Sequence, residues 1–194
     1  MRIQVGVMGS AGGRMKRGIR QKARELGQAI AEQNCVMVTG ACPGLPYDAV
    51  CGCKAAGGMT AGISPALDLY EHINRYQSPY EGFDVMIYTG DGLMGREVTG
   101  IRSCDIVVLL GGRSGTLGEF AIAYDEGKVI GVLSGTGGVA DHVDELVTII
   151  NKKTGAHLEF DDNPRKLMER LIKAYVRRKG KPPARLQNES AGAG

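Results

Sequence analysis

Short apolar blocks alternate along the chain with longer segments in which apolar residues recur at helical spacing. The blocks read as buried strands, and they cover residues 3–8, 35–39, 59–63, 84–88, 106–110, 128–133 and, more weakly, 157–160. The helical segments cover residues 16–33, 47–56, 115–126 and 164–179, with two more ending at Ser103 and near Lys152. Strands that alternate with helices favour right-handed crossovers. The pattern therefore predicts an α/β fold whose mainly parallel sheet of about seven strands is flanked by helices.

The length of 194 residues suits one domain with a substantial core. We expect that domain to span residues 1–179. Residues 180–194 are polar and contain proline and glycine, so they predict a disordered tail.

Residues 66–83 show no regular pattern and gather aromatic side chains in a chain that is only 5% aromatic. These side chains are Tyr70, Tyr76, Tyr80 and Phe83. On a lid they would stack on a purine or pterin ring, but they can equally pin an irregular connection to the surface or build a subunit interface. We favour the two structural interpretations.

Composition and charge narrow the functional classes. The net charge of +3 and the pI of 8.6 are too mild to indicate nucleic-acid binding, and the basic residues of the first helix read as a solvated face. The five cysteines lack metal-site or disulfide spacing, which predicts reduced thiols in a cytoplasmic protein without a metal site. No apolar run approaches the ~20 residues that span a membrane.

The stretch from Asp105 to Glu119 predicts a phosphate-binding corner. A buried strand runs into a glycine-rich turn and then a helix, a junction that presents free backbone N–H groups and the positive end of a helix dipole. The Glu119 carboxylate lies one helical turn further, where an acid beside an anion site is better explained by chemistry than by stability. The candidate phosphate ligands are Gly111, Gly112, Arg113, Ser114, Gly115 and Thr116.

Two further turns and one arginine extend this candidate site. Gly9 and Ser10 follow the first strand, and Gly40 and Gly44 follow the second, so both turns can face a ligand. Arg96 falls near a helix N-terminus, where the dipole disfavours a cation. A ligand anion or the Glu119 carboxylate would explain its presence.

Together these residues give the chain a likeness to a known family. Gly9-Ser10, the turn from Gly40 to Leu45, Arg96 and the stretch Gly111–Glu119 resemble the motifs of the LOG-like family of the SLOG superfamily, often labelled "possible lysine decarboxylase". The resemblance covers nearly all of residues 3–175 and implies a Rossmann-like, doubly wound nucleotide-binding domain. It also implies hydrolysis of the N-glycosidic bond of a nucleoside 5′-monophosphate, with Arg96 and Glu119 as catalytic residues, no required cofactor, and a homo-oligomer of at least two copies.

The chain also departs from the family pattern. Gly111 replaces the proline of the signature, Arg113 replaces its second glycine, and Glu97 replaces the lysine that typically follows the arginine. These departures resemble a branch that includes molybdenum cofactor carrier proteins and DprA-related proteins. They imply an alternative, in which the protein carries or senses a nucleotide or the molybdenum cofactor without hydrolysis. Binding of single-stranded DNA through the basic first helix is a third, weaker hypothesis.

Overall fold

The structure is a computed structural model that describes residues 1–179, so the tail expected at residues 180–194 lies outside the part described. The strands are β1 (Gln4–Gly9), β2 (Val36–Thr39), β3 (Met59–Ser64), β4 (Val85–Tyr88), β5 (Ile106–Leu110), β6 (Val129–Leu133) and β7 (His157–Asp161). The helices are α1 (Arg17–Glu32), α2 (Leu45–Ala55), α3 (Leu69–Asn74), α4 (Gly92–Arg102), α5 (Ser114–Asp125), a 3₁₀ turn (Gly138–His142), α6 (Val143–Ile150) and α7 (Pro164–Lys179).

The strands form one parallel sheet in the order β4-β3-β2-β1-β5-β6-β7. This confirms the predicted Rossmann-like α/β fold. The direction in which successive strands are added reverses at β1, which pairs with β2 on one side and β5 on the other. In open α/β sheets, the crevice outside the carboxyl ends of the strands at such a reversal is where ligands bind.

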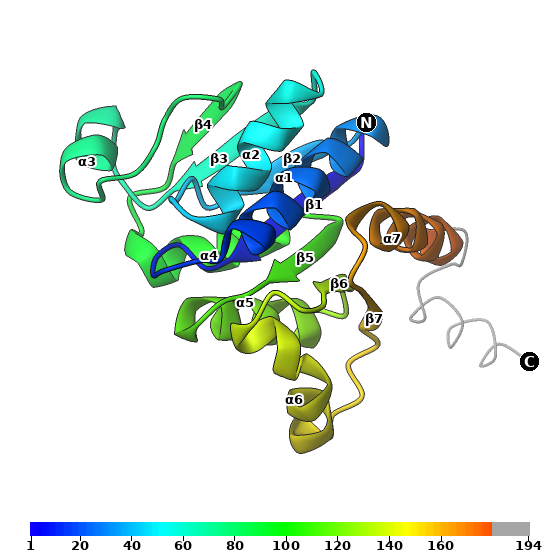
Figure 1. The fold of residues 1–194 in the computed structure, drawn as a ribbon. Helices are drawn as coiled ribbons and strands as arrows, with labels where there is room; N and C mark the ends of the chain where they lie inside the picture. Colours follow the sequence, from blue (N-terminus) through cyan, green and yellow to red (C-terminus); the bar gives the residue numbers. More distant parts are fainter. Residues whose placement is uncertain (180–194) are drawn as a thin grey trace, which may run out of the picture.

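Helices cover both faces of the sheet (Figure 1). On one face, α1 packs between α2 and α7, and the core there includes Leu26, Ile30 and Leu171. On the other face, α4 and α5 lie side by side over a second core that contains Ile101 and Phe120. Among residues 1–179, no helix combines the length and the apolar character that a membrane crossing requires.

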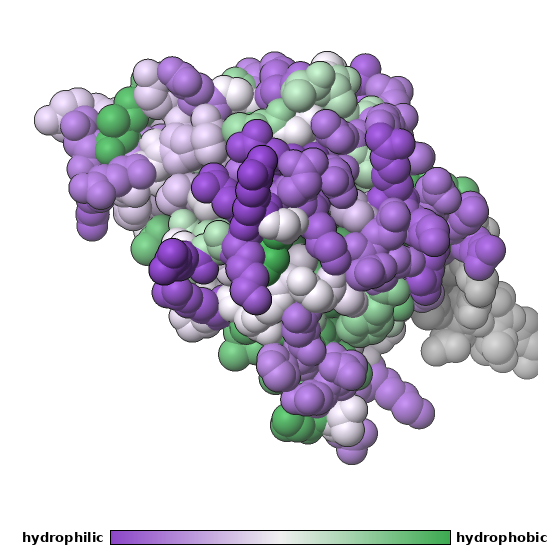
Figure 2. All heavy atoms as spheres, viewed as in Figure 1, coloured by the Kyte–Doolittle hydropathy of each residue, from purple (hydrophilic) through white to green (hydrophobic). Residues whose placement is uncertain are grey.

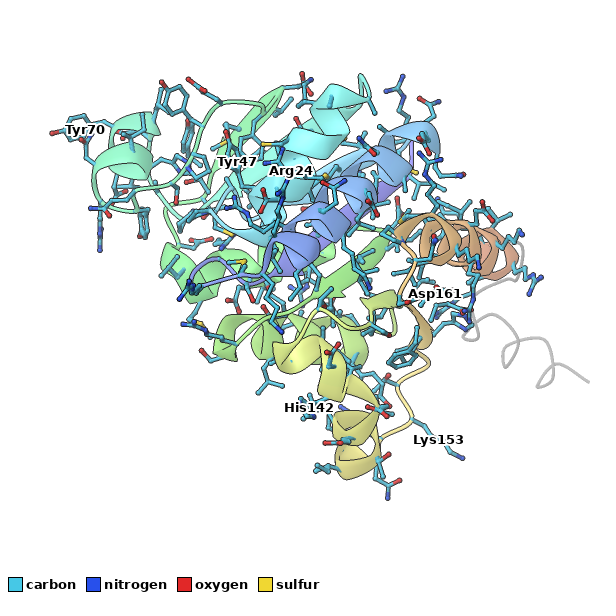
Figure 3. All side chains as sticks on the ribbon, viewed as in Figure 1. Arg24, Tyr47, Tyr70, His142, Lys153 and Asp161 are labelled. Carbon is cyan, nitrogen blue, oxygen red and sulfur yellow. The ribbon has the colours of Figure 1, made fainter. Side chains whose placement is uncertain are left out.

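Two glycines let α1 and α2 approach each other closely. A Cβ on Gly27 would lie 1.9 Å from the Ala49 carbonyl oxygen, and one on Gly52 would lie 2.0 Å from the Arg24 carbonyl oxygen. Beside this contact, the buried Asp48 carboxylate accepts hydrogen bonds from Arg20 at 2.7 Å and from Arg24 at 3.2 Å. The Arg24 side chain reaches across to α2 (Figure 3). Two arginines of the basic first helix therefore hold α1 against α2, while the surrounding face is hydrophilic (Figure 2).

The segment 66–83 contains one short helix, α3, that the sequence pattern did not predict. The fully buried His72 ring hydrogen-bonds Ser64 Oγ at 2.8 Å and the Pro79 carbonyl at 3.0 Å, which fastens the segment to the end of β3. Tyr70 points away from the body of the molecule (Figure 3) and is 76% exposed. The His72 contacts therefore pin this segment to the body of the protein, and the role of its aromatic side chains stays a prediction.

Candidate functional site

A pocket of about 350 Å³ opens at the carboxyl ends of β1 and β2, beside the start of α5. It therefore lies at the reversal of strand order where the fold favours a ligand. Nine of the residues predicted from the sequence line it: Gly9, Ser10, Gly40, Arg96, Arg113, Ser114, Gly115, Thr116 and Glu119. The topology thus brings together residues from four separate segments of the chain.

The start of α5 faces the pocket at the position where the sequence predicts an anion site. The helix begins at Ser114, and the residue before it, Arg113, provides no side-chain cap. The first N–H groups of a helix have no partner within the helix, so those of Ser114, Gly115 and Thr116 are free for a ligand at the pocket wall. The Thr116 hydroxyl belongs to the same wall, and its residue is only 3% exposed.

Gly111 and Gly112 do not line the pocket, although the sequence pattern includes them among its phosphate ligands. Both have positive φ, +61° and +101°. The Gly111 N–H donates to Thr136 Oγ1 at 2.9 Å, and the Gly112 N–H donates to Ser10 Oγ at 2.7 Å. Their backbone therefore ties the turn after β5 to the turns after β6 and β1.

Gly44 also lies outside this pocket, and it joins two turns instead. Its φ is +84°, and a Cβ there would lie 2.2 Å from the Ser10 carbonyl oxygen. The same carbonyl accepts the Leu45 N–H at 2.9 Å. Gly9 makes a comparable approach to β5, since its Cβ would lie 2.2 Å from the Leu110 carbonyl oxygen. These glycines shape the wall of the pocket by letting neighbouring backbones meet.

Arg96 extends from α4 under the end of β2, and its residue is 8% exposed. Nη1 donates to the Ile63 carbonyl at 3.3 Å, whereas the buried Nε has no hydrogen-bond partner within residues 1–179. A Cβ on Gly40 would lie 1.3 Å from Nη1, so only glycine leaves room for the guanidinium. A buried donor without a partner costs stability unless a ligand or water satisfies it.

Glu119 is 8% exposed and lies in the same pocket. Burial raises the pKa of its carboxyl from 4.5 to about 7, the Arg96 guanidinium opposes this rise, and the Glu97 carboxylate adds to it. Burial also raises the pKa of Glu97, which is 7% exposed, with Arg96 again opposing. The pocket thus holds two buried acids and one buried base.

The sequence did not assign two polar residues of the pocket, Cys42 and Glu97. Burial raises the pKa of the half-buried Cys42 thiol, and Arg96 opposes that rise. Cys42 lies inside the turn from Gly40 to Leu45 that the sequence assigns to the site, but only the glycines of that turn were named as ligand-facing. Glu97 did give a signal, because it replaces the lysine typical of the family that the chain resembles.

Arg113 lies at the mouth of the pocket with an exposed side chain. Its guanidinium reaches from the start of α5 to the turn after β1, where a Cβ on Gly13 would lie 2.3 Å from Nη2. Gly13 has a φ of +96°. The arginine that replaces a glycine of the family signature therefore adds a positive charge beside the free amides of α5.

Residues 2–168 match the family model described as the SLOG cluster4 family. The chain belongs to the SLOG cluster4 family. An uncharacterized protein of Archaeoglobus fulgidus is 31% identical over 132 residues, which are 68% of this chain and 80% of that protein. The predicted likeness to the SLOG superfamily is confirmed.

Solved structures similar to this SLOG protein include two that concern the molybdenum cofactor. The molybdenum cofactor binding protein of Rippkaea orientalis is 27% identical, with a TM-score of 0.73 over 91% of this chain and 98% of that one. The molybdenum cofactor carrier protein of Chlamydomonas reinhardtii is 25% identical, with a TM-score of 0.71 over 90% and 99% of the two chains. DNA processing protein A of Helicobacter pylori, 19% identical with a TM-score of 0.61 over 89% and 81%, shares the fold.

These neighbours correct one expectation drawn from the sequence. The family resemblance implied that no cofactor is required, with the molybdenum cofactor as a ligand only in the alternative. The two neighbours at 25% and 27% identity are named for the molybdenum cofactor that they carry or bind. The expectation that no cofactor is required is therefore wrong.

Proposed function

We propose that this SLOG protein binds the molybdenum cofactor, a phosphorylated pterin, and carries it without transforming it. The observation that carries the proposal is the coincidence, in one pocket, of the free amides of α5 with a buried Arg96 whose Nε has no partner among residues 1–179. Donors arranged in this way favour an anionic ligand. Similarity to a carrier and a binding protein for this cofactor supports the choice of ligand.

The residues present suit a ligand of this kind. The amides of Ser114, Gly115 and Thr116 would hold the phosphate, with the Arg113 guanidinium closing over it from the mouth. The volume of about 350 Å³ lies in the range of small-molecule sites. Leu93 and Met94 line the α4 side of the pocket and offer an apolar surface for a ring.

The test is to mix the purified protein with molybdenum cofactor released from a molybdenum enzyme. Protein-bound pterin is measured after gel filtration by the fluorescence of its oxidised form. We expect a saturable complex that Arg113→Ala weakens about tenfold, because a charge-assisted contact to phosphate is lost. Lys153→Ala, which removes an exposed cation outside the pocket, serves as the control. Absence of retained pterin on the wild-type protein would refute the carrier function.

One observation favours a second candidate, hydrolysis of a nucleoside 5′-monophosphate to free base and ribose 5-phosphate. The Glu119 carboxyl, with a pKa of about 7, lies beside Arg96 in a pocket with an anion site, an arrangement that suits general acid–base chemistry. The test is a panel of nucleoside 5′-monophosphates, with released base followed by chromatography. Release that Glu119→Ala abolishes would establish the hydrolase, and no release from any member would exclude it for that panel.

We also propose that the protein is a cytoplasmic homo-oligomer. Its five cysteines are free thiols, which suits a reducing compartment.

Leu93 and Met94 are 57% and 67% exposed at the pocket rim, and Leu117 of the adjacent α5 is 40% exposed. Apolar side chains grouped this way are typical of subunit interfaces. Analytical ultracentrifugation should give a dimer or larger, and Met94→Lys should shift it towards the monomer; a wild-type monomer at all concentrations would refute the proposal.

A further inference from the structure

Glu97 is a buried acid that the carrier and hydrolase proposals leave without a role. Its side chain lines the pocket from α4, and its residue is 93% buried, with an exposed fraction of 7%. Within the described chain, no hydrogen bond to its carboxylate is formed, and Arg96 is the one cation that lowers its pKa. Arg96 Nε is the one buried side-chain nitrogen or oxygen of the described residues without a partner, so the Glu97 oxygens reach the pocket, where a donor from outside the chain can meet them.

Two glycines of α5 make the space that this carboxylate occupies. A Cβ on Gly118 would lie 3.0 Å from Glu97 Oε2, and one on Gly115 would lie 3.3 Å from Oε1. Glycine within a helix is less favourable than alanine. Neither glycine has the positive φ that would require it for the backbone. Both glycines therefore leave room for the Glu97 carboxylate, which would have to shift if either position carried a Cβ.

The charges around the pocket show what this carboxylate requires. Glu97 and Glu119 are two buried acids that share one buried cation, Arg96. The remaining positive features, the α5 N-terminus and the exposed Arg113, suit the ligand's phosphate. An ionised acid near Gly115 repels that phosphate, and a ligand that also donates hydrogen bonds to the acid offsets this cost.

We propose that Glu97 is the specificity-determining residue of this site and that, with Glu119, it accepts hydrogen bonds from a ring N–H and the amino group next to it. Adjacent N–H and amino donors of this kind form the 2-amino-4-oxopyrimidine edge that guanine and pterins share, and a carboxylate matches them with its two oxygens. Leu93 and Met94 precede Glu97 by one helical turn on α4 and line the same wall. This wall thus combines an apolar surface with an acceptor, as a site for a flat ring with polar edges requires. The inference rests on the proposed binding function and names the ligand group that gives it selectivity.

The experiment compares guanosine 5′-monophosphate with inosine 5′-monophosphate, which lacks only the 2-amino group, by isothermal titration calorimetry. Ribose 5-phosphate reports on the phosphate end alone. We expect the wild-type protein to bind the guanine nucleotide about tenfold more tightly than the hypoxanthine nucleotide, since a site built for a donor rejects a ligand that lacks it. Glu97→Gln should reduce this preference to about twofold or less without weakening ribose 5-phosphate.

Two further variants separate selectivity from folding. Gly118→Ala keeps Glu97 but places a Cβ 3.0 Å from Oε2, so the carboxylate must shift and the preference should fall, while ribose 5-phosphate binding is retained. Glu169→Gln makes the same chemical change on an exposed face of α7 and should behave as the wild type. A preference that is absent from the wild type, or that survives Glu97→Gln, would overturn the inference and leave phosphate binding standing. If the wild type binds neither ribose 5-phosphate nor the molybdenum cofactor, the proposed function fails and this inference falls with it.

Discussion

Replacing Glu119 by glutamine should change how the stability of the protein depends on pH. Burial, reinforced by the Glu97 carboxylate and opposed by Arg96, raises the pKa of Glu119 from 4.5 to about 7. The unfolded chain exposes this carboxyl to water and restores its ordinary pKa. Since a pKa difference of one unit corresponds to about 1.4 kcal/mol, the whole difference is worth about 3 kcal/mol of folding free energy.

The sign follows from the two pKa values. Below pH 4.5 the Glu119 carboxyl is protonated in both states and contributes no pH dependence. Between pH 4.5 and about 7 the folded protein keeps the proton while the unfolded chain has lost it, so stability falls as pH rises. Above that window the group is ionised in both states, and the folded protein carries the full cost of a buried charge.

The assay is urea unfolding of the wild type and of Glu119→Gln at pH 5 and pH 8, with free energies extrapolated to water. Glutamine does not titrate, so the variant should gain stability relative to the wild type by about 2.5 kcal/mol between the two pH values. Glu169→Gln, an exposed change of the same kind, should show no such gain. A difference between wild type and Glu119→Gln that stays constant from pH 5 to pH 8 would refute the reasoning.

The other predictions concern glycines and the rim arginine. Gly40→Ala should abolish ligand-induced thermal stabilisation, since its Cβ would lie 1.3 Å from Arg96 Nη1; retained stabilisation would show that this guanidinium position is not needed. Gly27→Ala should lower the free energy of unfolding, measured in urea, by more than about 2 kcal/mol, because its Cβ would lie 1.9 Å from a backbone carbonyl oxygen. Gly18→Ala lies on the same helix, and its Cβ would have no neighbour within 4 Å. This control should raise the free energy of unfolding by about 0.5–1 kcal/mol. Equal effects of the two would contradict the α1–α2 packing. Arg113→Ala should make ribose 5-phosphate binding less sensitive to salt by titration calorimetry, and an unchanged salt dependence would exclude Arg113 from phosphate binding.

The strands of the fold were predictable from the sequence where both faces of the sheet are covered, because all residues of such a strand are then apolar. All five residues of β5 and all five of β6 are buried and apolar, so the sequence identifies both strands directly. The edge strand β7 reads His-Leu-Glu-Phe-Asp and gives a weaker signal, because one side of it is open. The six-residue helix α3 spans fewer than two turns and is too short to show a helical period, and its start is fixed by an Asp68 side chain that accepts the Glu71 N–H at 2.8 Å.

The candidate site was predictable only where its residues are neighbours in the sequence. The turn and helix from Gly111 to Glu119 could be interpreted locally, whereas Cys42 reaches the pocket because β1 pairs with both β2 and β5. Glycine patterns are also ambiguous: Gly115 lines the pocket, while Gly44 has its Cβ position 2.2 Å from the Ser10 carbonyl oxygen. A glycine that admits a ligand and one that admits another backbone look the same in sequence.

Glu97 departs from the family pattern, and its charge bears on whether the protein carries its ligand or hydrolyses it. In the family that the chain resembles, hydrolysis draws on the carboxylate equivalent to Glu119, and only the ionised form stabilises a cationic sugar. With a pKa of about 7, Glu119 is ionised in about half of the molecules at neutral pH, and Glu97 contributes to that rise where the family typically has lysine. Glutamate at position 97 therefore lowers the ionised fraction of Glu119 and places a second acid in the pocket. A smaller ionised fraction gives less stabilisation of a cationic sugar but leaves a group that can donate or accept a proton near neutral pH, so the nucleotide panel is the experiment that separates carrying from hydrolysis.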